Sequence, residues 1–464
     1  MPSDRLARLP VRSPEWWREK LGGDLAKRLP TVRRYERYYE GVHTLKFMTD
    51  RFKEAFGQIF DHLADNWMEL VVDAVAERLT VQGFRFGDDP KADNAAWSIW
   101  QANNLDAESK IGFVDALVQG VTYLLVEPIK GEPRITVEHP AQAIVAHEPG
   151  DRHRRAAGLK AWVDDDGHSL AWLWLPNGIH RWRSKKTVDK HTEWGDIRWD
   201  PLGGRLANPL GVVPLIPLVN RPRIMRPWGK SEIDNVTGTQ DAVNKLIVDM
   251  MVAAHFASFR QKWATGLEIP VDKDTGKPVE AFKEAVDRIW HTAAPDAKFG
   301  TFEAADLSQY VSSIEMLVQH IASQTRTPPH YFFLRGEFPS GESIKSAETG
   351  LVAKARDRMV HFGEALEQAM RLAFQIRKDA RSDEVKAETI WADPESRTES
   401  EMVDAAVKRK AIGVPSQQLQ EDVGYTPTQI ARFETMRMRD ALAAGTTAAI
   451  LNEPTDEPAT AATS

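Results

Sequence analysis

One helical pattern, roughly 35 residues long, limits most strongly what this 464-residue chain can fold into. It begins after a loop that contains Pro339 and Gly341, and it continues without a break to about Lys378. At 1.5 Å per residue, such a helix measures about 50 Å, and it is far longer than the average globular helix. A helix of this length is typical of an assembly or an extended frame, and not of one compact enzyme core.

The bulk composition indicates a folded, soluble chain with two to four structural regions. Hydrophobic residues make up 42% and charged residues 27% of the sequence. The formal charge of −7 provides no basic footprint for tight binding to duplex DNA. A conduit through which DNA slides is still allowed, since strong phosphate contacts would hold the duplex in place.

Several classes of protein are excluded by what the sequence lacks. It contains no cysteine, so disulfides and thiolate metal sites are impossible. The segment from Met1 to Pro10 has no apolar core and is not expected to be a signal peptide. No apolar run approaches 18 residues, so we expect no membrane span.

The first half of the chain divides into a helical and a β-rich part. Residues 14–120 are predicted to be mainly helical, with a short amphipathic turn around Trp16 and Trp17 and a longer helix from Phe60 to Val75 that closes at Gln82-Gly83. Apolar runs separated by turns then predict an antiparallel β region. The expected strands are residues 121–126, 134–137, 143–146, 159–163, 170–175 and 179–183.

The second half places two amphipathic helices on either side of a small insert. One helix is predicted from Asp234 to about Phe259, and its partner ends before Thr327-Pro-Pro329. The insert between them contains a turn at Asp274-Thr-Gly276, a helix from Val279 to Trp290 and a strand near Phe299. Beyond the long helix we expect a strand at 388–394, helices at about 398–411, 416–422 and 427–444, and a disordered tail at 446–464.

Five short segments occur in an order that resembles the portal proteins of tailed bacteriophages, of the siphophage type. They are Trp228-Gly-Lys-Ser-Glu232 with Asp241-Ala-Val-Asn244, Thr327-Pro-Pro-His330, Ser340-Gly-Glu-Ser-Ile-Lys-Ser-Ala-Glu348 at the head of the long helix, and Ile390-Trp-Ala-Asp-Pro394. The resemblance covers roughly residues 20–445.

The resemblance implies an α+β, mainly helical portal fold with wing, stem, clip and crown regions. The implied regions are an N-terminal helical wing at 1–125, a β-rich wing at 126–227, a first stem helix at 228–259, a clip at 260–305, a second stem helix at 306–327, a tunnel loop at 328–343, a long wing helix at 344–380, a helical crown at 381–445 and the disordered tail.

The resemblance also implies a function without catalytic residues, metal or cofactor. Twelve copies would form a ring at a unique capsid vertex of the virion, after assembly in the host cytoplasm, and double-stranded DNA would pass through its channel during packaging and ejection. The implied partners are the terminase large subunit, an adaptor or head-completion protein, and the major capsid and scaffolding proteins, with no membrane. The alternatives are a DNA-processing packaging enzyme and another head-completion or capsid interaction protein.

Two sets of residues are candidates for the channel wall. Polar positions on the first stem helix could face the lumen, namely Asp234, Asp241, Lys245 and Asp249. The tunnel loop would bring Arg335 to the phosphates and narrow the bore with Phe338. The loop residues are Leu334, Arg335, Gly336, Glu337, Phe338, Pro339, Ser340 and Gly341.

Sites of other chemistry are weakly supported. Gly229-Lys230-Ser231 lacks the glycine five residues upstream that a phosphate-binding loop requires, because that position is Ile224. The acids and histidines between Glu138 and His153 match no metal-site spacing and favour a solvated loop. Asp272–Gly276 lacks the remaining ligands of a calcium loop.

Tryptophans and basic residues are concentrated in the β region. The six tryptophans are predicted to fill a core or an interface, and the basic residues to form a charged rim, with a DNA patch as the alternative. The tryptophans are Trp162, Trp172, Trp174, Trp182, Trp194 and Trp199; the basic residues are Arg181, Arg183, Lys185, Lys186 and Lys190.

Overall fold

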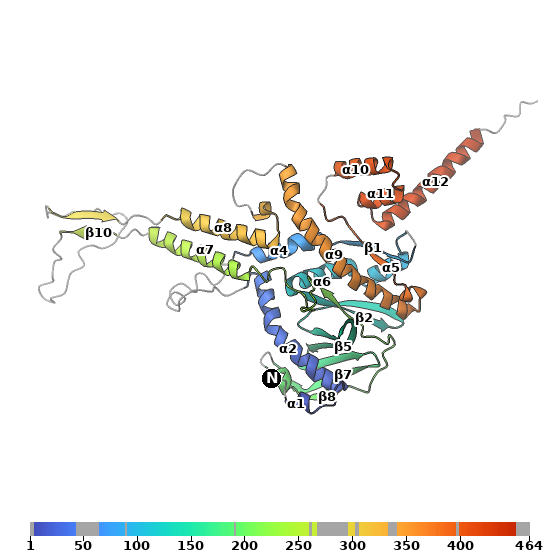
Figure 1. Cartoon of the computed structure of the whole chain (residues 1–464), viewed down its shortest axis with the longest axis horizontal. Helices are drawn as coiled ribbons and strands as arrows, with labels where there is room; N and C mark the ends of the chain where they lie inside the picture. The colour runs from blue at the N-terminus through green and yellow to red at the C-terminus, as the bar shows by residue number, and fades with distance from the viewer. Residues whose placement is uncertain are drawn as a thin grey trace, which may run out of the picture. The chain divides into compact units, whose positions relative to one another are not determined.

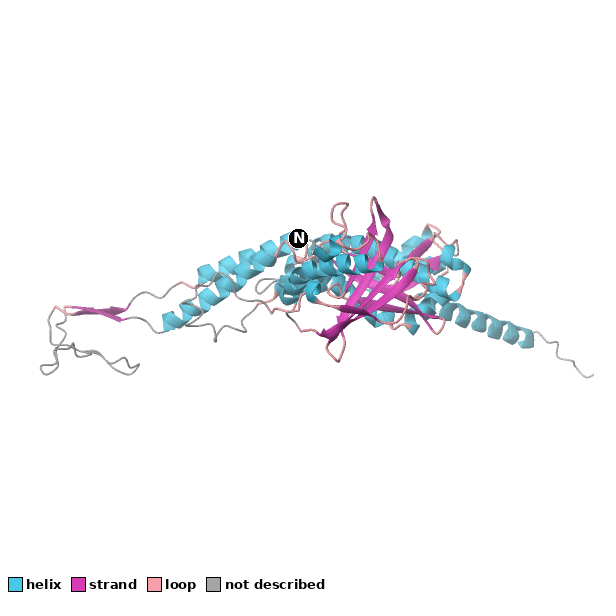
Figure 2. Ribbon diagram, turned by 90° about the horizontal axis from the view of Figure 1, so that it is seen from below, coloured by secondary structure: helices cyan, strands magenta, loops and turns pink. Residues whose placement is uncertain are grey.

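The computed structural model has two compact units, and both mix helices with antiparallel strands (Figures 1 and 2). The larger unit comprises residues 1–42, 66–237 and 322–464, and the smaller comprises 43–65 and 238–321. The mixture confirms the predicted α+β class. The structure describes residues 4–42, 65–88, 91–189, 192–258, 262–266, 296–301, 306–332, 341–395 and 399–451.

A five-stranded antiparallel sheet in the order β4-β5-β6-β7-β8 forms one half of the core of the larger unit. Helix α2 (Pro14–Tyr39) lies against it, and Trp17, Leu21 and Leu25 pack onto its apolar face. The predicted amphipathic turn is therefore the start of a 26-residue helix, whose first turn is capped by Ser13. The strands are β4 (Ala143–Glu148), β5 (Asp151–Val163), β6 (His168–Leu175), β7 (Gly178–Thr187) and β8 (Trp199–Pro201).

A second sheet, in the order β3-β2-β9, supports the longest helix. Its strands are β3 (Glu132–Glu138), β2 (Val121–Ile129) and β9 (Leu215–Val219). Helices α6 (Leu105–Gln119) and α9 (Gly341–Arg377) both pack on it, and Phe113 of α6 stacks on Phe362 of α9 at 5.4 Å between ring centroids. The 37-residue α9 confirms the predicted long helix and is buried along most of one face.

Two strands more than 300 positions apart in the sequence pair with each other. β1 (Val81–Phe86) runs antiparallel to β12 (Ala387–Trp391), and only the second was predicted. The prediction that Gln82-Gly83 closes a helix is wrong, since both residues lie in β1 while the preceding helix α4 (Trp67–Ala76) ends earlier. The reason is that Val81, Phe84 and Phe86 are buried on this strand. Residues 60–64 of the predicted helix lie outside the described ranges.

The smaller unit contains the two amphipathic helices that flank the insert. α7 (Thr237–Ser258) and α8 (Ser308–Thr325) run alongside each other in both views (Figures 1 and 2). Their connection includes a two-stranded sheet of β10 (Lys262–Thr265) and β11 (Lys298–Thr301). The predicted turn at 274–276 and helix at 279–290 lie outside the described residues.

Short helices and turns complete the larger unit. They are α1 (Asp4–Ala7), α5 (Asn94–Ala102), and the 3-10 turns η1 (Trp194–Asp196), η2 (Pro329–Phe332) and η3 (Ala380–Asp383).

The C-terminal helices follow the predicted order. They are α10 (Glu399–Ala411), α11 (Ser416–Asp422) and α12 (Pro427–Leu451). Because α12 continues to Leu451, the prediction that the disordered tail begins at 446 is wrong for its first six positions. Residues 452–464 are not described.

Candidate functional site

A buried ion cluster joins α9 to the segment that leads into α7. Glu232, five residues before the start of that helix, accepts hydrogen bonds from Arg358 Nη2 at 2.7 Å and Nε at 3.0 Å. Lys354 Nζ lies 2.9 Å from the second carboxylate oxygen. All three side chains are almost fully buried, so the two cations and one anion are sheltered from water.

The same cluster holds the C-terminal end of α8. Lys354 Nζ also donates to the carbonyl of Thr325, at 3.0 Å, in the last turn of that helix, where carbonyls have no partner within the helix. Asn220 donates to Glu232 Oε1 at 3.0 Å. Burial by itself would raise the pKa of Glu232, but the charges of Lys354 and Arg358 outweigh it and lower that pKa to about 2.

A second set of polar contacts lies at the N-terminal part of α9. Glu348 accepts a hydrogen bond from Tyr331 at 3.3 Å, and it lies 3.6 Å from Arg78 and 3.7 Å from His330. Arg78 also donates to the hydroxyl of Tyr331, at 2.9 Å. The Thr-Pro-Pro-His turn is thereby held against α4 and α9, at the point where the chain leaves α8.

The four predicted stem residues do not form one polar face. Asp234 precedes α7, where it accepts from Tyr35 and lies 3.4 Å from Lys230, so its placement on the helix was wrong. Asp241 is only 5% exposed within the chain, which contradicts a channel-facing role for it. Lys245 and Asp249 form an i,i+4 ion pair, and both remain partly exposed.

The predicted tunnel loop falls mostly outside the described residues. Leu334–Ser340 belong to the range that is not described, and Gly341 is the first residue of α9. Its roles at the channel therefore stay a prediction.

The alternative chemistries find little support in the described part of the chain. Within it, no group of three or more acids and histidines is placed to hold a metal ion. His147 and Glu148 lie in β4 and His153 in β5, so the expectation of a solvated loop was wrong for them. Ser231 of the Gly-Lys-Ser segment is buried, and among the described helices none is long and apolar enough to cross a membrane.

Five of the six tryptophans of the β region pack on the core, whereas Trp162 is half-buried beside Trp172 and belongs to neither half of the core. Trp174 and Trp182 are buried, and Trp172, Trp194 and Trp199 are partly buried against the two halves of the core. The neighbouring basic residues form surface ion pairs: Arg183 lies 2.9 Å from Asp164, and Lys185 lies 3.0 Å from Asp200. The charged-rim prediction is consistent with these pairs, while Lys190 is not described.

Known proteins resemble this chain over most of its length. The family model described as "Phage portal protein, SPP1 Gp6-like" matches residues 19–421. The chain belongs to the phage portal protein family. The portal protein of Mycobacterium phage D29 is 33% identical over 392 residues, covering 80% of this chain and 77% of its own length. The portal protein of Mycobacterium phage L5 is 31% identical over 427 residues, which cover 86% of this chain and 84% of the L5 protein.

Solved structures of gene transfer agent particles are also similar to this portal chain. One is the neck of an empty particle, computed with C6 symmetry, with a TM-score of 0.46 and 10% identity over 77% of this chain and 88% of that one. Another is the neck of a native particle, computed with C12 symmetry. Its TM-score is 0.44, and it is 11% identical over 82% of this chain and 94% of that one.

Sequence reasoning missed the ion cluster in this portal chain. Glu232, Lys354 and Arg358 are far apart in the sequence, and charged residues are expected in solvent. One signal was available: Lys354 and Arg358 are four residues apart and interrupt the apolar face of α9, beside Leu351, Ala355 and Met359.

Proposed function

We propose that this chain is the subunit of a twelve-membered portal ring at one vertex of the virion capsid, and that it acts as a passive conduit without enzymatic activity. The strongest support for this proposal is the match to the portal family model over residues 19–421. Two portal proteins that are more than 30% identical to this chain support it further. Double-stranded DNA passes through the ring during packaging and ejection.

The helices of the smaller unit line the stem in this proposal. α7 and α8 are the two stem helices, and the β10–β11 sheet belongs to the clip, which meets the terminase large subunit and later an adaptor or head-completion protein. The five- and three-stranded sheets with α2 and α9 form the wing, which faces the major capsid and scaffolding proteins, and α10–α12 form the crown. Lys245 and Asp249 are the stem residues that keep a proposed channel-facing role, because both are partly exposed.

The ring is tested by mass photometry or electron microscopy of the purified full chain, with ATPase activity assayed in the same samples. We expect closed rings of about twelve 52.2 kDa chains with a central hole and no ATP hydrolysis. A monomer that hydrolyses ATP would contradict the proposal and favour a packaging motor.

The tunnel loop is tested by shortening it. Deleting Arg335–Gly341 is expected to leave ring size unchanged and to impair DNA packaging or retention, because the loop is proposed to contact the DNA backbone. A variant in which the same positions are replaced by a Gly-Ser linker of equal length controls for strain between α8 and α9. Normal packaging by the deletion variant would remove the reason to assign the loop to the channel.

A further inference from the structure

Strand β3 is the terminal strand of the sheet β3-β2-β9, and its outer edge pairs with none of the described strands. In an antiparallel ladder, the backbone groups of successive residues point to opposite edges of a strand. Val126 of β2 donates to the carbonyl of Pro214, on the β9 side, at 3.2 Å. The two residues beside Val126 therefore face β3, where they lie opposite Arg134 and Thr136. The backbone groups of Ile135, which lies between these two, must point to the outer edge.

A side chain occupies the first part of this edge. Asn103, in the turn between α5 and α6, accepts a hydrogen bond from Ile135 N at 2.9 Å and donates to the carbonyl of Pro133 at 3.2 Å. Its amide therefore takes the place of a peptide group in a neighbouring strand. Beyond Asn103, the carbonyl of Ile135 and both outward backbone groups of Val137 have no hydrogen-bond partner in the described ranges.

A cavity of about 590 Å³ runs along this edge, in the range of clefts that enclose ligands. Residues of β3 form one wall, and the turn between α5 and α6 forms another, together with Lys160 and Arg377. Backbone groups in a cavity need a hydrogen-bonding partner, and an open strand edge is a template for pairing with another chain. The cavity therefore gives a further strand room to reach the free groups of Ile135 and Val137.

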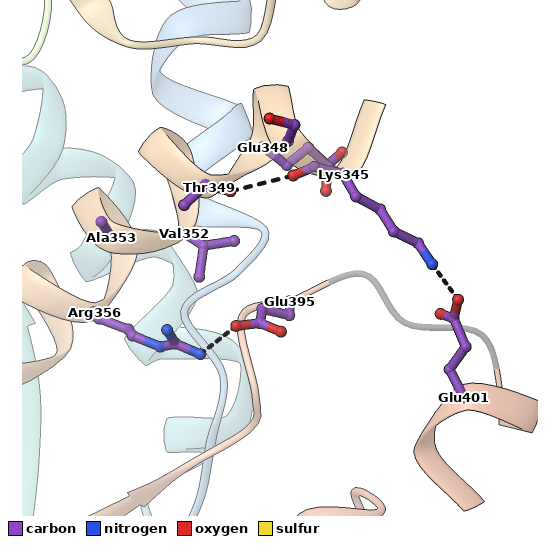
Figure 3. Close-up of a pocket in the computed structure, with 9 residues that line it drawn as sticks. Lys345, Glu348, Thr349, Val352, Ala353, Arg356, Glu395 and Glu401 are labelled. Atoms are coloured by element: carbon purple, nitrogen blue, oxygen red, sulfur yellow. Dashed lines mark hydrogen bonds and ion pairs between the residues drawn. The ribbon is translucent and has the colours of Figure 1, made fainter. Parts of the chain in front are cut away.

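The cavity beside the N-terminal part of α9 differs in this respect, because its charged side chains pair with one another (Figure 3). Arg356 Nη2 lies 2.6 Å from Glu395, and Lys345 forms an ion pair with Glu401. A partner would have to break these pairs, whereas at β3 it would bond to groups that have no partner in the described ranges.

Most charges along the β3 cavity are balanced within the chain. Lys160 lies 2.8 Å from Glu138, and Arg377 lies 2.6 Å from Glu132. Arg134 is exposed and forms no ion pair in the described part of the chain. It is therefore a cation that a partner can reach without breaking an existing pair.

The two faces of an added strand would meet different charges. The side chain of Val137 faces α6, since a Cβ on Gly112 would lie 3.0 Å from it. Alternation along β3 then places Arg134 on the opposite face. Glu108 of α6 lines the cavity and, within the described residues, also has no ion pair. A carboxylate on the added strand is favourable on the Arg134 face and unfavourable on the α6 face.

We propose that the outer edge of β3 binds an extended peptide segment of a partner protein, which adds a fourth strand to the sheet. The peptide backbone bonds to Ile135 and Val137, and an acidic side chain of the peptide meets Arg134. Backbone groups in line at strand spacing select an extended chain as the occupant, because such a chain supplies complementary groups at the same spacing. The inference goes beyond the proposed ring and does not depend on it, since the site lies within one chain.

A proline substitution tests the backbone contact. Val137→Pro removes only an outward N–H, because Val137 does not donate to β2, and proline is tolerated at such edge positions. Val137→Ala keeps the N–H and controls for the lost side chain. The probe is a displayed library of random twelve-residue peptides, selected on the immobilised full chain. We expect enriched peptides with an acidic residue that bind wild type and Val137→Ala alike, and Val137→Pro at least tenfold more weakly.

A charge reversal tests the side-chain contact. Arg134→Glu should weaken the same peptides at least tenfold, and replacing their acidic residue by lysine should restore binding to this variant. Hydrogen exchange of residues 133–138 should slow when an enriched peptide is added to the wild-type chain.

Three results would overturn the inference. The first is a selection that yields no peptide that binds the wild-type chain, and the second is a set of peptides that bind Val137→Pro as tightly as wild type. The third is a Val137→Pro chain that folds but loses ring formation, while Val137→Ala keeps it. That result would assign the edge to a neighbouring copy of this chain.

Discussion

Helices α9 and α7 both carry charged side chains, but these differ in their exposure to water. On α9, Lys354 and Arg358 are buried around Glu232, whereas on α7 the Lys245–Asp249 pair stays in contact with water. Breaking a buried pair leaves an uncompensated charge and costs about 3–5 kcal/mol, but an exposed i,i+4 pair contributes about 0.3–0.5 kcal/mol. The same residue types therefore stabilise the packing of α9, whereas on α7 they remain accessible to a partner.

Removing the shared anion is expected to have the largest effect. Glu232→Gln leaves Lys354 buried without an anion and leaves Arg358 with only the exposed Asp357 as a partner, so the free energy of unfolding should fall by about 3–5 kcal/mol. Denaturant titration of the full chain measures this. Glu388→Gln, which breaks an exposed pair with Arg85, is the matched control and should cost less than about 1 kcal/mol. Equal losses for the two variants would show that burial does not distinguish them.

Interrupting α7 should come next. Ile247→Pro removes a backbone donor within the helix and costs about 3 kcal/mol or more locally. If α7 is a stem helix, this variant should fail to form rings in electron microscopy while the larger unit keeps its fold. Ile247→Ala retains the helix and should assemble; rings of normal size from the proline variant would remove the stem assignment.

A half-buried acid, Asp115, provides an intermediate case between the two helices. Burial raises the pKa of Asp115 to about 6, with the charge of His139 opposing and that of Glu36 adding to the shift. Its protonated form is favoured in the fold, so stability is lost as the pH rises from about 4 through about 6. Asp115→Asn should add about 1 kcal/mol at pH 7.5, discounted for partial exposure, and nothing near pH 3.5. Thermal unfolding at the two pH values checks this, with exposed Asp88→Asn as the control.

The exposed pair on α7 should contribute least. Lys245→Ala and Asp249→Ala are each expected to cost about 0.5 kcal/mol or less at low salt, and the coupling between them should disappear at about 1 M salt. A double-mutant cycle by denaturant titration measures that coupling. A coupling above about 2 kcal/mol would place this pair in the same class as the cluster on α9.

Local periodicity predicted much of this fold. The strands between Val121 and Arg183, the long α9 and the helix end before Thr327 all follow from residues near one another in the sequence. The pairing of β1 with β12 could not be predicted, because it depends on contacts across 300 positions. Asp234 was misplaced because polar and apolar residues continue the helical spacing upstream of Thr237, where a hydrogen bond from Tyr35 and an ion pair with Lys230 hold a turn instead.

Candidate site residues were harder to predict than elements. The helical spacing placed Lys245 and Asp249 on a polar helix face, but it also placed Asp241 on that face, and Asp241 is buried. The members of the ion cluster meet only after α9, the end of α8 and the segment before α7 have come together. Three-dimensional packing, which periodicity does not encode, decides which charges lose their water.

The pairing of β1 with β12 has a consequence during synthesis. When β1 leaves the ribosome, its antiparallel partner has not yet been translated, and the missing 300 residues take about 15 to 60 s at 5–20 residues per second. Throughout that interval one strand of the larger unit lacks its partner. A nascent chain can therefore complete this unit only when translation is nearly finished, which keeps partly made subunits out of any assembly that requires the completed unit.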